Sequence, residues 1–284
     1  MPDGWQWDRT LFRGSAAHYA RGRLPYAPGF PETLAGALGL DGRGRLLDVG
    51  CGPGTVLLPM ARFFAEVVGV DPDEDMLAEA RRQAGRRGVT HARWVAARAE
   101  DLPAGLGEFR AVVFAQSFHW THRDRVAAVV REMLEPGGAF VHVSELQDPP
   151  PAPAPPPSPA PPYERIRELV RRYLGPVRRA GQGVLVDGTP GGEELVVARA
   201  GFVHFARHVV PGGDVVTRTT DDLVAWTFSR SDAAPHLFGD RREEFERDLR
   251  ALLEETAPGL HPFAERLPAT EIRIWRKPPE RGRA

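Results

Sequence analysis

Hydrophobic and polar positions follow two alternating patterns along the first half of the chain. Short apolar runs are separated by longer segments in which apolar residues recur every three or four positions. The short runs predict buried strands and the longer segments predict amphipathic helices, so their alternation predicts βαβ units and a parallel sheet. The predicted strands are residues 45–49, 66–70, 92–96, 110–115 and 139–144, and the predicted helices are residues 53–64, 74–85 and 123–134.

Helix-breaking residues support these helix and strand boundaries. Pro136, Gly137 and Gly138 follow the helical segment that ends at Leu134, and we expect them to stop that helix before the next strand. In the second half, the pattern predicts helices at 163–174, 193–200, 221–229 and 241–256, a glycine-rich stretch at 181–192, and strands at 202–210 and 270–276. We expect the last strand to run antiparallel beside residues 202–210.

Between the two halves, residues 148–162 hold ten of the 28 prolines, in the sequence DPPPAPAPPPSPAPP. Proline fixes φ and lacks an N–H donor, so this segment is predicted to be an extended or disordered connector, with a PxxP docking site as the alternative. The chain then divides into an N-terminal helical lid (1–40), a core (41–147), the connector, and a C-terminal half (163–284) with cap helices and the last two strands. The predicted fold is α/β: a doubly wound, Rossmann-like mixed sheet of seven strands.

Composition narrows the class of protein. The 37 basic and 38 acidic residues leave a net charge of −1, which gives no overall attraction to nucleic acid or to anionic lipid. Cys51 is the single cysteine, so the chain forms no internal disulfide. The N-terminus lacks a basic segment followed by an apolar stretch, and no run of eighteen apolar residues occurs. We therefore expect a cytoplasmic protein whose partner is a small molecule rather than a nucleic acid or a membrane.

The strongest chemical motif is LLDVGCGPG at residues 46–54, an apolar strand that runs into a turn with Gly50, Gly52 and Gly54. A nucleotide-type ligand at the end of the first strand needs close backbone approach, which Gly50 and Gly52 allow. Gly54 would let the next helix pack tightly on the sheet. The spacing is GxGxG and differs from the GxGxxG of dinucleotide binders.

Two carboxylates accompany this turn. Asp71 ends the second apolar strand, where a carboxylate can accept both hydrogen bonds of a ribose diol. Asp48 precedes the glycines and would lie near a cationic or amino group rather than a pyrophosphate. Together they favour a ligand that carries an amine and a sulfonium.

With these motifs the sequence resembles the class I S-adenosylmethionine-dependent methyltransferases, in the small-molecule branch that includes ubiquinone-pathway and trans-aconitate-like enzymes. Five motifs in the expected order carry the resemblance, and a sixth segment, HYARGRLPY, is similar to the lid that precedes the fold in this branch. The five motifs are LLDVGCGPG, VGVDPDEDML (68–77), AEDLP (99–103), FAQSFHW (114–120) and LEPGGAFV (134–141).

The resemblance implies S-adenosylmethionine as cofactor, with S-adenosylhomocysteine as product. Gly50, Gly52 and Gly54 would line its methionine and ribose, and Asp71 would bind the ribose hydroxyls. Met76 would cover the adenine, and Tyr19 and Arg21 would close over the cofactor. Arg98 stands where the family often has aspartate. The remaining implied cofactor contacts are Asp48, Pro72, Ala99, Glu100 and Gln116.

His119 is the candidate catalytic residue, because the end of the fourth strand faces the transferred methyl in this family. An imidazole can accept the acceptor's proton near neutral pH, although substrate positioning is the alternative role. Phe118, Trp120 and Trp226 are candidate substrate contacts. Cys51, inside the turn, is expected to be a buried filler, and the other eight histidines have no metal-site spacing, so we expect no metal.

The end of the fourth strand also argues against several methyltransferase classes. Gln116, Ser117, Phe118 and His119 stand where enzymes of nucleobase amino groups carry an [N/D/S]PP[Y/F] element. No cysteine is placed for attack on a cytosine carbon, and no carboxylate cluster is placed for a catechol-type metal. The remaining interpretation is metal-independent methylation of a small molecule.

Residues 211–262 hold eleven acids and six arginines, a net charge of −5, which favours a cationic or polyhydroxylated amine. The leading interpretation is N-methylation of an amino-sugar intermediate in bacterial antibiotic biosynthesis or other secondary metabolism. O- or C-methylation of a polyketide, quinone or small carboxylic acid remains open. More distant alternatives are a nicotinamide-dependent oxidoreductase and a non-catalytic protein that binds the cofactor, and the balanced charge does not favour RNA methylation.

Overall fold

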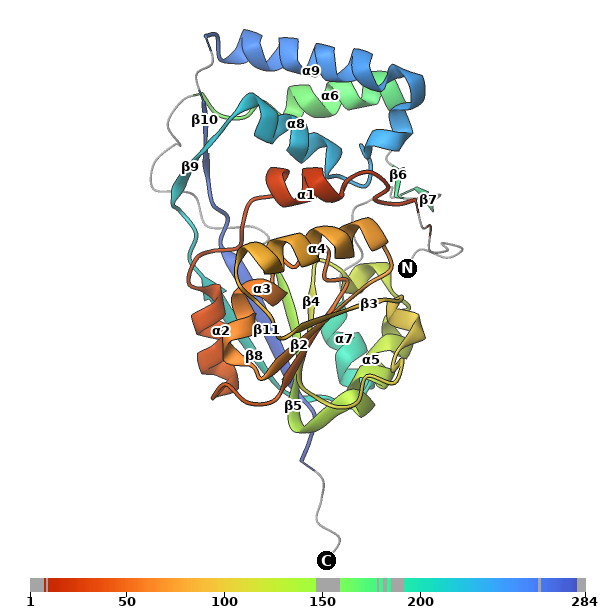
Figure 1. Cartoon of the computed structure of the whole chain (residues 1–284), viewed down its shortest axis with the longest axis vertical. Helices are drawn as coiled ribbons and strands as arrows, with labels where there is room; N and C mark the ends of the chain where they lie inside the picture. Colours follow the sequence, from red (N-terminus) through yellow and green to blue (C-terminus); the bar gives the residue numbers. More distant parts are fainter. Residues whose placement is uncertain are drawn as a thin grey trace, which may run out of the picture.

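Seven strands form one mixed sheet in the order β3-β2-β1-β4-β5-β11-β8 (Figure 1). The computed structural model describes residues 8, 10–146, 159–177, 179–180, 183–184, 192–259 and 262–279. β11 runs antiparallel to both of its neighbours, β5 and β8, whereas β1 to β5 pair in parallel. The strands are β1 (Arg45–Val49), β2 (Glu66–Asp71), β3 (Ala92–Ala96), β4 (Phe109–Ala115), β5 (Leu134–Glu145), β8 (Val203–Val210) and β11 (Thr270–Arg276). The predicted doubly wound α/β fold and its antiparallel last strand are confirmed.

Helices cover both faces of this sheet, and alternate side chains of the strands divide between two apolar cores. On β1, Leu46 faces the core beneath α2 and α3, and Leu47 faces the core beneath α5 and α7. Parallel strands buried on both faces read as continuous apolar runs, which is why the sequence pattern located them. The helices are α2 (Phe30–Leu38), α3 (Leu57–Met60), α4 (Glu74–Arg86), α5 (Arg123–Met133) and α7 (Glu193–Arg199).

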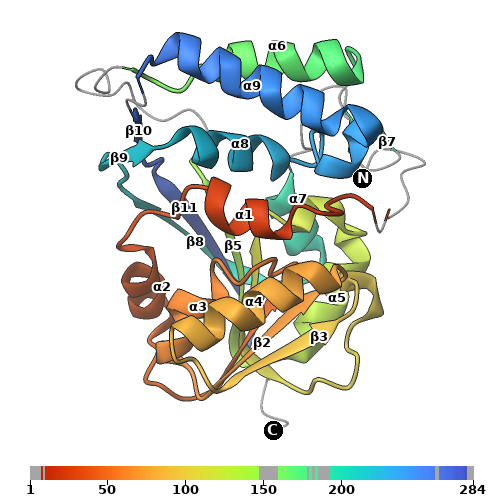
Figure 2. The ribbon, with the colours of Figure 1, turned by 45° about the horizontal axis from the view of Figure 1, so that its top comes forward.

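A third apolar core lies in a cap above the carboxyl ends of the strands (Figure 2). The cap consists of α6 (Tyr163–Leu174), α8 (Thr220–Phe228), the 3₁₀ segment η4 (Pro235–Arg241) and α9 (Arg242–Thr256). A two-stranded antiparallel ribbon, β9 (Val215–Arg218) with β10 (Phe263–Arg266), connects α8 and α9 back to β8 and β11. The sequence pattern did not predict this ribbon, because four-residue strands give too short a period to recognise.

The N-terminal lid helix α1 (Ala16–Gly22) lies between the cap and α4 (Figures 1 and 2). Gly22 allows this packing, because a Cβ built on it would lie 2.2 Å from the backbone nitrogen of Trp226 on α8. Arg218, almost fully buried, donates to the Gly22 carbonyl at 2.6 Å and to the Glu265 carboxylate at 2.8 Å. The lid is therefore fixed to the cap through backbone contacts as well as side chains.

Two predicted boundaries were wrong. The helix expected at 53–64 is one α-helical turn, α3, followed by the 3₁₀ turn η1 (Ala61–Phe63), because Gly54 has a φ of +85° and Pro59 has no N–H to donate. The loop expected at 135–138 lies within β5, which begins at Leu134, because Leu134 pairs with Phe109 before the register shifts. The connector predicted at 148–162 lies outside the described residues as far as 158, and most of the glycine-rich stretch at 181–192 also lies outside them.

The short hairpin strands β6 (Arg179–Ala180) and β7 (Gly183–Val184) complete the described strands. The remaining 3₁₀ turns are η2 (Ala99–Asp101) and η3 (Phe118–Trp120), and both follow strands at the carboxyl edge of the sheet. Within the described residues, no helix combines the length and the apolar character needed to cross a bilayer.

Candidate functional site at the carboxyl ends of the strands

Two adjoining cavities lie where β1, β2 and β4 end, beneath the lid. The first, called the cofactor cavity below, is lined by residues that follow β1, β2, β3 and β4. The second, called the lid cavity, has a volume of about 240 Å³ and lies against the lid residues 19–26. The two share Phe12, Tyr19, Gly50, Gly52, Ala115, Gln116 and Trp120.

The glycine turn after β1 is joined to the end of β2 by hydrogen bonds. The Gly52 amide donates to Oδ2 of Asp71 at 2.8 Å, and the Asp73 amide donates to Oδ1 of the same carboxylate at 2.9 Å. The Gly50 amide donates to the Val70 carbonyl at 2.8 Å. The carboxylate of Asp71 therefore sits at the wall of the cofactor cavity in a defined orientation.

Gly50 has no room for a side chain. Its φ is +70°, and a Cβ would lie 2.5 Å from Cβ of Ser117, whose hydroxyl donates to the Val49 carbonyl at 2.5 Å. Gly54, by contrast, does not line either cavity, and a Cβ on it would touch Leu58 at 3.0 Å. The expected packing role of Gly54 fits this position better than a place against the ligand.

Burial gives the two acids of the site unusual protonation behaviour. It raises the pKa of Asp48 to about 7 and that of Asp71 to about 6. Asp48 lines the lid cavity, is 1% exposed, and has no hydrogen-bond partner for either oxygen among the described residues. Burial disfavours the ionised form of Asp48, and the backbone of Leu57 offsets only part of that cost.

The predicted cofactor residues Tyr19, Gly50, Gly52, Asp71, Pro72, Met76, Ala99, Glu100 and Gln116 all line the cofactor cavity. Glu100 also accepts the His122 amide at 2.8 Å, which fixes it against the start of α5. Gln116 has a φ of +55°, an unfavourable conformation for a residue with a side chain, and such strain concentrates at functional sites. Arg98 reaches the rim of this cavity while its guanidinium pairs with Asp101.

Arg21 was expected to close over the cofactor, but the structure directs it elsewhere. Its side chain is 52% exposed and pairs with Asp222 at 2.9 Å and Asp221 at 3.4 Å, so it joins α1 to α8. Arg23, which the sequence analysis did not select, lines the lid cavity instead. Its guanidinium lies 5.0 Å from the centre of the Tyr19 ring and donates to the Ser229 carbonyl at 3.2 Å, and its buried Nε has no hydrogen-bond partner among the described residues. Arg23 is the C-cap residue of α1 and has an extended backbone, so no helical spacing marks it in the sequence.

The predicted substrate contacts separate into three environments. Trp120 lines both cavities, as expected of a wall residue. Phe118 was wrongly placed: it is fully buried beneath the sheet edge and packs on Phe114 and Phe140, with ring centres 5.0 and 5.2 Å away. Trp226 was also wrongly placed, because it lies on the cap face of α8 against Tyr163, with ring centres 4.4 Å apart, and lines a different cavity.

His119 lines the lid cavity, with its ring 4.8 Å from that of Trp120. Glu145, at the end of β5, lines the same cavity and was not predicted. Partial burial raises the pKa of Glu145, and the nearby Arg23 offsets part of that rise. Cys51 is buried, and burial raises the pKa of its thiol well above the ordinary value, which keeps it protonated. Within the described ranges, no group of three or more His, Cys, Asp or Glu side chains could hold a metal.

Comparison with known proteins agrees with this arrangement. A methyltransferase-domain family model matches residues 46–138, which include the glycine turn and Asp71. An uncharacterized methyltransferase of Mycobacterium bovis, Mb3374, is 30% identical over 220 residues, 77% of each chain. The chain belongs to the class I S-adenosylmethionine-dependent methyltransferases.

Three further similarities are also to methyltransferases. Demethylmenaquinone methyltransferase of Thermus thermophilus is 37% identical over 56% of this chain and 74% of that protein. The chain spans 43% of the length of a probable S-adenosylmethionine-dependent methyltransferase of Saccharomyces cerevisiae, CRG1, at 30% identity. The structure of a putative type II methyltransferase from Anaeromyxobacter dehalogenans superimposes with a TM-score of 0.51 at 24% identity, and covers 91% of this chain and 100% of that one. This last likeness supports the fold.

Proposed function

We propose that this methyltransferase transfers a methyl group from S-adenosylmethionine to the nitrogen of a small, hydroxylated amine such as an amino sugar. The observation that carries the proposal is the lid cavity, where the carboxylate of Glu145 lies among the rings of Tyr19, Tyr26 and Trp120. Carboxylates pair with ammonium groups, and aromatic faces attract them as well. The net charge of −5 over residues 211–262, which include Ser231 of the cavity wall, points the same way.

The residues present fit the cofactor. Asp71 would accept hydrogen bonds from the ribose hydroxyls, since a carboxylate has lone pairs left after accepting two backbone amides. Met76 and Ala99 would enclose the adenine. Asp48 and Arg23, each with a buried polar atom that lacks a partner, fit the ammonium and the carboxylate of the methionine portion. Two complementary charges thus match the two ends of an amino acid.

Methyl transfer from a sulfonium requires mainly that the protein align the acceptor nitrogen with the methyl group. When bound, S-adenosylmethionine supplies a methyl group on a positively charged sulfur. Glu145 and the aromatic walls would orient the acceptor nitrogen toward that methyl, and alignment of this kind can lower a barrier by several kcal/mol, roughly 7–11 in the best cases. His119, at the end of β4, would take the proton that the nitrogen gives up or hold the acceptor in its neutral form.

A second candidate is O- or C-methylation of a quinone precursor. It is favoured by the similarity to a protein named demethylmenaquinone methyltransferase, and aromatic walls would also suit a flat ring. The two candidates differ in the charge of the acceptor: a neutral quinol carries no ammonium group to pair with the carboxylate of Glu145.

Matched acceptors separate the two candidates. The purified protein would be incubated with S-adenosylmethionine and, separately, with an amino sugar, the same sugar bearing a hydroxyl in place of the amine, and a naphthoquinol. The proposal expects methylation of the amino sugar alone, located on nitrogen by NMR, and a Glu145→Gln variant that loses most of this activity. Methylation of the naphthoquinol alone, equal in wild type and Glu145→Gln, would reject it.

A further inference from the structure

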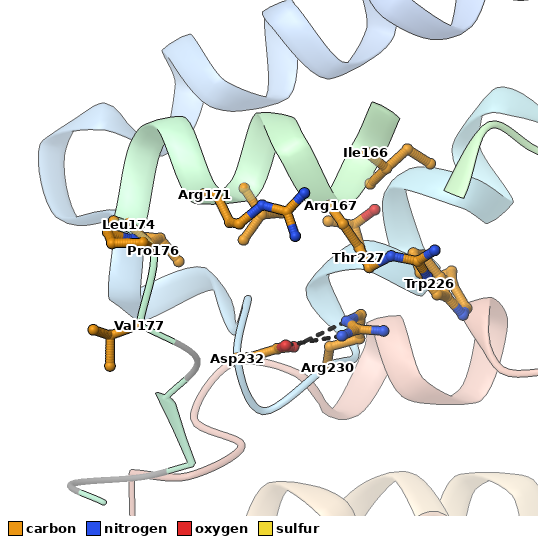
Figure 3. Close-up of a pocket in the computed structure, with 12 residues that line it drawn as sticks. Ile166, Arg167, Arg171, Leu174, Pro176, Val177, Trp226, Thr227, Arg230 and Asp232 are labelled. Carbon is orange, nitrogen blue, oxygen red and sulfur yellow. Dashed lines mark hydrogen bonds and ion pairs between the residues drawn. The ribbon is translucent and has the colours of Figure 1, made fainter. Parts of the chain in front are cut away.

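A separate cavity of about 390 Å³ lies in the cap, between α6 and the segment that runs from Trp226 to Asp232 (Figure 3). It is called the cap cavity below. None of its lining residues belongs to the cofactor cavity or the lid cavity. Ser231 lines the lid cavity, whereas its neighbours Arg230 and Asp232 line the cap cavity, so a single loop separates the two spaces.

Three guanidinium groups line the cap cavity. Arg167 and Arg171 are four residues apart on one face of α6, and Arg230 lies on the opposite wall (Figure 3). Arg230 is neutralised within the cavity by Asp232, with two bonds of 2.9 and 2.8 Å. Any unbalanced positive charge of the lining therefore belongs to Arg167 and Arg171 on α6.

Arg167 and Arg171 share one acid. Both donate to Glu164, at 2.7 and 3.1 Å, and Glu164 is exposed and lies outside the cavity lining. Among the described residues, one carboxylate is shared by two guanidiniums, so the part of the α6 wall that these side chains form keeps a surplus positive charge. Each guanidinium has five N–H donors, which leaves donors available to a further anion. Their side chains are 43% and 48% exposed, so a ligand could reach them without a conformational change.

The rest of the lining is largely apolar. Ile166, Val170 and Leu174 recur along the same helix. Trp226, on α8, lies near the Ile166 end of the cavity, and Leu174 lies at the other end (Figure 3). The Trp226 ring contacts the Tyr163 ring and the Arg230 guanidinium. The guanidinium carbon lies 5.0 Å from the centre of the Trp226 ring. A concave apolar surface with a few convergent charged groups is the usual form of a small-molecule site.

We propose that the cap cavity binds an amphipathic organic anion. Its carboxylate is held by Arg167 and Arg171, and its apolar body packs on Val170, Leu174 and Trp226. Inorganic phosphate lacks the apolar body, and an alkyl amine lacks the charge, so neither is a strong ligand. The inference stands apart from the proposed methylation reaction, because the ligand occupies a different space.

The test uses the full chain saturated with S-adenosylhomocysteine and the fluorescent probe anilinonaphthalene sulfonate, an aromatic anion. The probe is titrated first, and then displaced with octanoate, octylamine or inorganic phosphate. We expect displacement by octanoate and not by the other two. A protein that binds no probe, or one from which octylamine displaces it as well as octanoate does, would overturn the proposal.

Variants on α6 locate the site. Arg167→Gln combined with Arg171→Gln is expected to weaken octanoate binding by about tenfold or more, since charge-assisted hydrogen bonds are lost. Arg165→Gln is the matched control: it removes the same charge from the same helix, but Arg165 pairs with Glu255 and lies outside the cavity lining. Val170→Trp, which fills the cavity and keeps every charge, should also weaken binding. Equal octanoate affinity in all variants, each folded by circular dichroism, would place the anion elsewhere.

Discussion

The amide of Gly52 donates to the carboxylate of Asp71 over 2.8 Å, so the turn that ends β1 and the residue that ends β2 form one rigid unit. The nineteen-residue separation between them in the sequence is bridged by the parallel pairing of β1 with β2. Position and orientation of the carboxylate thus depend on the turn, and the conformation of the turn depends on its glycines.

The absence of room for a side chain at Gly50 can be tested by substitution. Gly50→Ala would place a methyl group 2.5 Å from Cβ of Ser117 at a φ of +70°, so we expect loss of cofactor binding together with about 1–3 kcal/mol of stability. Thermal unfolding and S-adenosylhomocysteine titration measure the two effects. Adding Ser117→Gly should restore part of the stability, because it removes the collision but not the unfavourable φ. A single variant that is as stable as the wild type would contradict the steric account.

Arg23 and Arg21 make a matched pair on the lid. Arg23→Ala should weaken cofactor affinity by about tenfold or more, because the guanidinium that lines the lid cavity is lost. Arg21→Ala removes an exposed ion pair to Asp222, and such pairs contribute about 0–1 kcal/mol, so affinity should change little. Calorimetric titration of both variants decides the point. A larger loss in Arg21→Ala would restore the original assignment of Arg21 to the cofactor.

Part of the fold and of the site could be predicted from local sequence patterns. The glycine turn, Asp71 and the strand order follow from local pattern, because a parallel strand buried on both faces and a turn that must approach a ligand each leave a direct signature. The position of His119, in η3 four residues after the end of β4, likewise lies at the lid cavity.

Other assignments depended on tertiary packing that no local pattern records. Phe118 and His119 are neighbours, but the 3₁₀ turn η3 directs one into the core and the other toward the lid cavity. Trp226 turns away from the site because its backbone packs against Gly22, a contact between residues 204 positions apart. Glu145 was missed because a single acid at a strand end has no distinguishing neighbour in sequence.

Asp48 predicts a pH dependence of cofactor binding. With a pKa of about 7, its carboxyl is largely protonated at pH 6 and ionised at pH 8. Because the ionised form is the partner for an ammonium group, affinity for S-adenosylhomocysteine should rise between these values. Asp48→Asn should bind more weakly at pH 8 and keep only the smaller rise that comes from ionisation of Asp71, whose pKa is about 6. An unchanged pH profile in Asp48→Asn, measured by calorimetry, would assign the effect to another group.

The stability of the ligand-free protein provides a second test of Asp48. Raising the folded-state pKa of Asp48 from 3.8 to about 7 favours the folded state at low pH, and this advantage is lost as pH rises through that window. Asp48→Asn removes the cost of a buried charge. The ligand-free variant should therefore be more stable than the wild type at pH 8, and this gain should shrink by pH 4.

His119 should act on the reaction and not on the cofactor. His119→Ala is expected to lower turnover by about a hundredfold while S-adenosylhomocysteine affinity stays within about twofold, as for loss of a proton acceptor. His122→Ala is the control, because His122 is exposed at the start of α5 and lines neither cavity. Wild-type turnover in His119→Ala would remove this residue from the mechanism.

Asp71 gives the most direct test of the central claim, that the unit of Gly52 and Asp71 holds S-adenosylmethionine. We would titrate S-adenosylhomocysteine into the wild type, Asp71→Ala and Asp73→Ala by calorimetry. Asp73→Ala keeps the backbone amide that donates to Asp71 but removes the carboxylate that caps α4 by accepting the amides of Asp75 and Met76, so it tests the cost of losing this cap. The account predicts one site in the wild type, an affinity about a hundredfold weaker in Asp71→Ala, and a nearly unchanged affinity in Asp73→Ala. Equal affinity in the wild type and Asp71→Ala would contradict it.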